Sequence, residues 1–132
     1  MLYQINSNNS LEEIEHRLHD SAARHRFGVI ATHDLRDIMN RKGVNLDMEC
    51  RIYEVCNPLQ AKQVLDLDGA ISTALPCRIS VYGSKGRYTL ATMRPTEMMK
   101  AFAHAELEPV AREVEEVILQ MMRDAASEEG RV

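Results

Sequence analysis

The chain lacks any long apolar segment. Its 132 residues contain no apolar run near the ~18 residues that a membrane-spanning helix needs, so we expect no contact with a membrane interior. The first ten residues also lack the basic-then-apolar pattern of a secretory signal, and we therefore expect a cytoplasmic protein. The remaining composition, 45% apolar and 27% charged residues, is typical of one globular domain.

The chain also lacks an excess of positive charge, and its net charge is -4. Residues 1–104 carry thirteen basic and twelve acidic side chains, whereas residues 105–132 carry three and eight. A nearly neutral body with an acidic tail offers no attraction for nucleic acid or an anionic membrane surface. We therefore divide the chain into an α+β core domain, residues 1–104, and an acidic amphipathic helix, residues 105–132, packed on the core or at a dimer contact.

Cysteine is scarce, with residues at positions 50, 56 and 77 only. With no sign of export, this number does not indicate a disulfide framework. No Cys-x-x-Cys pair is present, so we expect no structural zinc site. A phosphate-loop motif is missing as well, because the glycine-containing segment 83–86 lies between two predicted strands and is interpreted as a hairpin turn.

Alternation and helical spacing predict a single compact α+β domain. Ser10 and Glu13 form a capping box at the start of the first helix, and Asn57 with Pro58 starts another. An antiparallel sheet with helices packed on one face is the economical way to cover the apolar side of each element. The predicted strands are 2–5, 27–32, 46–56, 77–82 and 87–93, and the predicted helices are 11–25, 35–42, 58–68, 97–102 and 106–126.

The last helix is the longest and carries an apolar stripe. Its stripe residues recur at spacings of three and four, which is typical of one helix face. This stripe either packs on the body of the same chain or pairs with a second copy. The stripe consists of Leu107, Val110, Val114, Val117 and Met121, widened by Ala111 and Ile118.

Three segments resemble a known family. Residues 54–61 (EVCNPLQA), 75–82 (LPCRISVY) and 26–29 (RFGV) are similar to the small bacterial and archaeal family catalogued as domain of unknown function 302. The resemblance covers roughly residues 11–102, and the acidic last helix is less typical of the family. It implies a compact α+β fold that tends to form homodimers, and it implies no established activity.

The best candidate site combines two cysteines. Cys56 directly precedes a helix N-terminus, where free N–H groups and the helix dipole can lower a thiol pKa. Cys77 begins a strand that can lie beside the one ending at Cys56. If these ends meet, Glu54, Asn57 and Arg78 join the two thiols around a helix end suited to an anion. Such a site can bind a small anion, hold a soft metal such as Cu(I), or perform thiol redox chemistry.

The alternative is that Cys56 and Cys77 only fill space at element junctions. Cys50 shares a face with Met48 and Ile52, so we interpret it as a core residue. The pair His16 and His19 can meet on one helix face with acidic neighbours, but a solvated charged face explains it better.

His33 and Asp34 are adjacent and could support acid–base chemistry. No nucleophile stands at motif spacing from them, and a turn-capping Asp34 is the simpler interpretation.

Three hypotheses about function follow, and the first is favoured. It is a non-catalytic domain that binds a small anionic or thiophilic ligand near Cys56, Asn57 and Cys77. The second is a thiol redox protein using Cys56 with Cys77 as its resolving partner. The third is an adaptor that binds another protein through the C-terminal helix. The sequence names no reaction, cofactor or ligand.

Overall fold

Five strands form one antiparallel sheet in the computed structural model, which describes residues 1–128. They are β1 (Leu2–Ser7), β2 (Gly28–Asp34), β3 (Glu49–Cys56), β4 (Cys77–Ser84) and β5 (Arg87–Met93). The spatial order is β1-β5-β4-β3-β2. Strands β2 to β5 therefore form a meander, and β1 pairs with β5 at one edge of the sheet.

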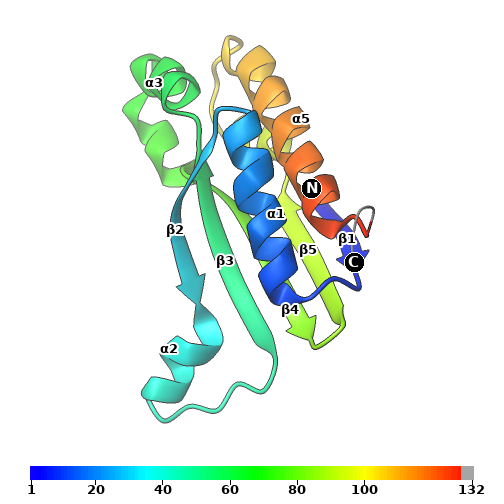
Figure 1. Ribbon diagram of the computed structural model, residues 1–132. Helices are drawn as coiled ribbons and strands as arrows, with labels where there is room; N and C mark the ends of the chain where they lie inside the picture. Colours follow the sequence, from blue (N-terminus) through cyan, green and yellow to red (C-terminus); the bar gives the residue numbers. More distant parts are fainter. Residues whose placement is uncertain (129–132) are drawn as a thin grey trace.

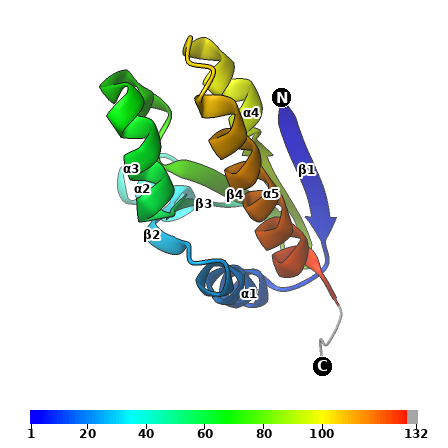
Figure 2. The same cartoon turned by 90° about the horizontal axis from the view of Figure 1, so that it is seen from above.

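The two longest helices, α1 (Leu11–Arg24) and α5 (Leu107–Ala126), cover one face of this sheet. The shorter helices are α2 (Leu35–Arg41), α3 (Pro58–Leu67) and α4 (Pro95–Met98), with 3₁₀ segments η1 (Gly69–Ala74) and η2 (Met99–Ala101). Figures 1 and 2 show α1 and α5 side by side on this covered face, with α3 beside the first turns of α5. The predicted antiparallel sheet with helices on one face is confirmed. In residues 1–128, no helix is both long and apolar enough to cross a bilayer.

The core lies between the covered face and the helices. Tyr53, Ile79 and Leu90 project from three adjacent strands and are fully buried. Leu18 of α1 and Ile118 of α5 pack against them and are also fully buried. Complete burial of one such aliphatic side chain contributes about 1.5–3 kcal/mol. These contacts position the sheet and both long helices relative to one another.

Strand β3 differs from its prediction in length and in the face it buries. It begins at Glu49 rather than at residue 46. Tyr53 and Val55 point into the core, so Cys50 and Ile52 project from the opposite, open face of the sheet. Cys50 is buried as expected, but it lies outside the core cluster. Because side chains alternate, the choice between the two faces depends on the neighbouring strands and not on the alternation itself.

The hairpin between β4 and β5 requires a glycine. Gly83 has φ +143°, and a Cβ atom there would lie 2.1 Å from the carbonyl oxygen of Arg87. Any side chain would therefore force the two strands apart. The predicted hairpin turn is confirmed.

Helix α5 packs on the body of its own chain. Leu107, Ile118 and Met121 are among its buried residues. The N-terminal part of the helix packs against α3, η1 and η2, and the C-terminal part against the sheet and α1. The apolar stripe is therefore used inside the fold. Of the acidic residues, Glu108, Glu113 and Glu116 are exposed, whereas Glu115 accepts hydrogen bonds from Thr96.

Candidate functional site

A small apolar pocket lies where the ends of β3 and β4 meet α3 and α5. Its lining includes Cys56 at the end of β3, Cys77 at the start of β4 and Met99 from η2. Leu107 and Val114 of α5 close one side of it. The cavity volume is about 40 Å³, and no acidic or basic side chain of residues 1–128 lines it. We call this cavity the thiol pocket.

The start of α3 forms one wall of the pocket and is already capped. The side chain of Asn57 accepts hydrogen bonds from the backbone N–H groups of Leu59 at 3.0 Å and Gln60 at 3.1 Å. The N–H of Ala61 donates to the carbonyl of Asn57 at 2.9 Å, and Pro58 has no N–H. The free donors that make a helix N-terminus attractive to an anion are therefore absent from this end. The predicted Asn57 cap is confirmed.

Both thiols of the pocket favour the protonated form. Burial raises the pKa of Cys56 above its ordinary value. Burial, together with the neighbouring Cys56, raises the pKa of Cys77 to about 11. This direction is opposite to the lowered pKa expected for Cys56 from its place before a helix. All three cysteines of the protein are free thiols.

Glu54 and Arg78 do not join the thiols. In the β3–β4 register, Glu54 lies opposite Arg78 and Val55 lies opposite Cys77. Because adjacent residues of a strand point to opposite faces, Glu54 and Arg78 project from the open face and Cys77 points into the core. Of the five predicted site residues, the structure brings together Cys56, Asn57 and Cys77 and leaves the two charged residues behind the sheet.

Two residues of the pocket were missed by the sequence reasoning. Met99 is a third sulfur-containing residue of the lining, and no sequence motif singles it out. Gln60 donates from Nε2 to Glu113 at 3.3 Å, while its Oε1 is buried and finds no partner within residues 1–128. The only sequence signal for Gln60 was its place in the cap of α3.

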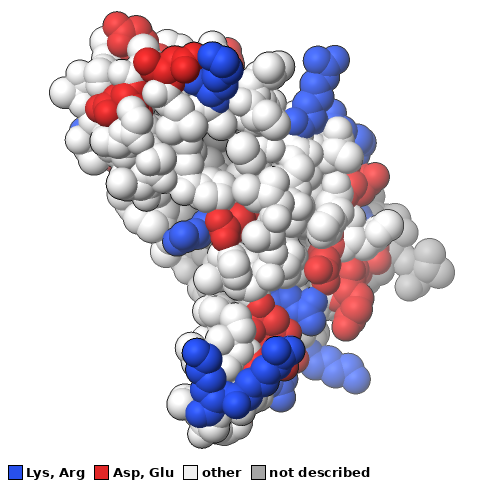
Figure 3. Space-filling view, turned by 90° about the vertical axis from the view of Figure 1, so that its left-hand side faces the viewer, with Lys and Arg blue, Asp and Glu red and all other residues white. Residues whose placement is uncertain are grey.

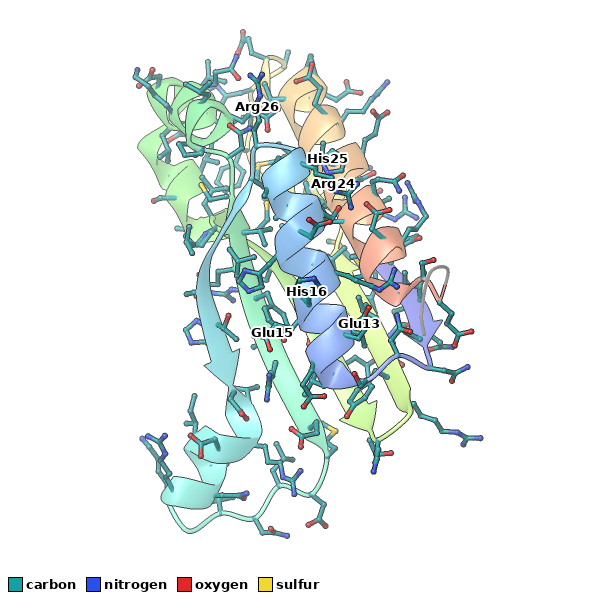
Figure 4. The ribbon with its side chains drawn as sticks, viewed as in Figure 1. Glu13, Glu15, His16, Arg24, His25 and Arg26 are labelled. Atoms are coloured by element: carbon teal, nitrogen blue, oxygen red, sulfur yellow. The ribbon has the colours of Figure 1, made fainter. Side chains whose placement is uncertain are left out.

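The two histidines of α1 lie on its solvent-facing side. His16 and His19 are exposed, and the neighbouring charges form ion pairs such as Arg17–Glu13 at 2.8 Å. Figure 4 shows His16 on the outer surface of α1 near Glu13 and Glu15. This is the solvated charged face that the sequence favoured.

His33 does not form a pair with its neighbour Asp34. The Nε2 atom of His33 bonds to Glu54 across the strands. The side chain of Asp34 instead caps α2, accepting from the N–H of Asp37 at 3.0 Å. Residues 1–128 contain no cluster of three or more His, Cys, Asp and Glu side chains arranged to hold a metal ion.

A comparison with protein families matches residues 3–125 to the model described as "Domain of unknown function DUF302". The chain belongs to the DUF302 family. A solved structure, an uncharacterised conserved DUF302 protein from Bacillus stearothermophilus, shares 25% sequence identity and a TM-score of 0.87. The match covers 96% of this chain and 98% of that one. A search of curated proteins finds no match.

The family match extends further along the chain than the sequence resemblance did. Residues 3–125 include nearly all of β1 and of α5, so the acidic helix is part of the DUF302 domain. This agrees with the packing of α5 on the sheet. The thiol pocket, which α5 helps to close, also lies entirely within the matched DUF302 region.

Proposed function

We propose that this DUF302 domain binds a small soft ligand without transforming it, and that the ligand is a thiophilic metal ion of the Cu(I) class. The observation that carries the proposal is the lining of the thiol pocket, a small apolar cavity that includes three sulfur-containing residues, Cys56, Cys77 and Met99. Soft thiolate and thioether ligands select Cu(I) over harder ions.

The size of the pocket favours an ion over an organic molecule. Its volume of about 40 Å³ holds roughly three water-sized groups, each needing about 10–15 Å³. A drug-sized ligand needs a pocket of about 300–1,000 Å³. The capped start of α3 and the uncharged lining give no support to the anionic ligand that we also considered.

The raised thiol pKa values make the affinity for such an ion depend on pH. Both thiols are protonated near neutral pH, so each must release its proton when the metal binds. Release of two protons makes the apparent affinity rise about hundredfold for each pH unit in this range. The metal keeps its oxidation state, and the two protons leave to solvent.

We would titrate the protein with Cu(I) under anaerobic conditions against a chromophoric Cu(I) chelator. One ion per chain is expected, with at least a hundredfold weaker binding in Cys56→Ser and Cys77→Ser. Cys50→Ser is the matched control and is expected to bind normally, because Cys50 does not line the thiol pocket. Folding of every variant is checked by circular dichroism.

Equal affinity in Cys56→Ser, Cys77→Ser and the wild type overturns the proposal. A reversible loss of two hydrogens in mass, mapped to a Cys56–Cys77 disulfide, supports the thiol redox hypothesis in its place. A raised thiol pKa opposes that hypothesis, because the thiolate is the reactive form.

A further inference from the structure

A second pocket lies behind the segment that walls the thiol pocket. Leu75 and Pro76 line both cavities. The second cavity has a volume of about 130 Å³ and is also lined by Arg78, Met93 and Met98. We call it the Arg78 pocket. Arg78 and Met93 both project from the open face, so this pocket and the thiol pocket lie on opposite sides of the sheet.

Arg78 lines this pocket, is exposed to solvent, and has no charged partner within residues 1–128. Its cross-strand neighbour is Glu54, and opposite charges placed this way usually pair. Here the carboxylate of Glu54 bonds to His33 instead. Within residues 1–128, the guanidinium of Arg78 has neither a hydrogen bond nor an ion pair. Its five N–H donors, in the fork geometry that suits a carboxylate, are therefore available.

The rest of the pocket is apolar apart from Thr73. The hydroxyl of Thr73 is already used, since it donates to the carbonyl of Ala70 at 2.8 Å. Met93 and Met98 add unbranched, adaptable side chains that can adjust to different apolar groups. An apolar cavity of about 150 Å³ is known to hold benzene, so a cavity of about 130 Å³ fits a group of similar size.

We propose that the Arg78 pocket binds a small organic monoanion, with its carboxylate on Arg78 and an apolar group of about benzene's size against Met93 and Met98. This function is separate from metal binding at the thiol pocket. The sequence suggested an anion site beside the two cysteines; this proposal places the anion in the Arg78 pocket, across the Leu75–Pro76 segment from the thiol pocket.

Benzoate is the probe, followed by amide chemical shifts in a titration of ¹⁵N-labelled protein. Saturable shifts are expected around residues 73–78 and 93–98, and Arg78→Met is expected to weaken benzoate binding at least tenfold. Arg87→Met is the matched control, since Arg87 is an exposed arginine on the neighbouring strand β5 outside this pocket, and it is expected to bind normally.

Two further ligands distinguish the contribution of the negative charge from that of the apolar ring. Benzyl alcohol has the ring without the charge, and inorganic phosphate has charge without the ring; both are expected to bind at least tenfold more weakly than benzoate. Binding that is equal in Arg78→Met and wild type, or shifts that do not saturate, overturns the proposal. Normal benzoate binding by the Cys56→Ser/Cys77→Ser double variant is expected if the two pockets act independently, so either proposal can fail alone.

Discussion

At Cys56, two effects on the thiol pKa act in opposite directions. The dipole at a helix N-terminus stabilises a thiolate by about 0.3–1 kcal/mol, which is less than one pKa unit. Burial in apolar surroundings disfavours the charged form by up to about 3–5 units for fully buried groups. The Asn57 cap also occupies the N–H donors that a thiolate would use. The balance therefore falls on the side of burial, and the pKa of Cys56 is raised.

This balance predicts slow thiol chemistry at neutral pH. The alkylation rate of Cys77 with iodoacetamide is expected to keep rising beyond pH 10, because its pKa of about 11 leaves little thiolate below that pH. The rate at each cysteine is measured by peptide mass mapping. In urea-unfolded protein the same rate should level off near pH 9. A plateau below pH 8 in the folded protein would contradict the raised pKa and favour the redox hypothesis.

The residues of the site were only partly predictable for a physical reason. Asn57 followed by Pro58 specifies a helix start through local chemistry, so its cap could be predicted from the sequence. The meeting of Cys56 with Cys77 depends on the β3–β4 register, which alternation alone leaves open. Alternation along each strand sends Glu54 and Arg78 to the other face, and it could have separated Arg78 from its neighbour Cys77 in the sequence alone.

At the scale of elements, the C-terminal end of α5 is held by hydrogen bonds from the N-terminal segment of the chain. The Nδ2 atom of Asn9 donates to the carbonyls of Ala125 at 3.2 Å and Ser127 at 2.7 Å. Ser7 donates to the carbonyl of Ala126 at 2.9 Å. These bonds satisfy carbonyls that a helix end otherwise leaves to solvent, and they connect α5 to β1.

The packing of α5 predicts a large effect of one core substitution. Ile118→Ala is expected to lower the free energy of unfolding by about 2–5 kcal/mol, because Ile118 is fully buried against the sheet. The exposed Glu116→Ala on the same helix serves as control, with a change within about 0.5 kcal/mol. Urea unfolding measures both. A decrease in the free energy of unfolding below about 1 kcal/mol for Ile118→Ala would mean that α5 contributes little to the core. That result would favour the hypothesis that α5 binds another protein.

Most elements followed from the sequence because their signals are local. The capping box of Ser10 and the alternation in β4 predicted α1 and β4 to within two residues. The start of β3 was misplaced because residues 46–48 continue the same alternation without a strand to pair with. Pairing partners, not propensity, decide where such a strand begins.

On the whole molecule, charge is distributed unevenly over the surface. Figure 3 shows Lys and Arg side chains gathered around α2 at one end, while the middle of this side of the molecule carries few charges. The outer side of α5 carries exposed acidic residues, including Glu108, Glu113 and Glu116. Two copies of this acidic surface would repel each other, so α5 is a poor contact for a second copy.

The homodimer implied by the family resemblance stays a prediction, and we expect it to use the open face of the sheet. Leu2 is 55% exposed there, and its register partner Met93 is 49% exposed. Native mass spectrometry is expected to show a dimer for the wild type and a monomer for the Leu2→Glu/Gln4→Glu variant, which adds charge to this face.

Leu59→Glu tests the other side of the molecule, because Leu59 is 75% exposed on α3 and away from the open face. This control is expected to remain dimeric. Dissociation of Leu59→Glu while Leu2→Glu/Gln4→Glu stays dimeric would place the contact at α3, and a monomeric wild type would contradict the dimer itself. Because Met93 also lines the Arg78 pocket, a dimer through the open face would bring the second copy beside that pocket. Anion binding and assembly would then depend on neighbouring parts of the same surface.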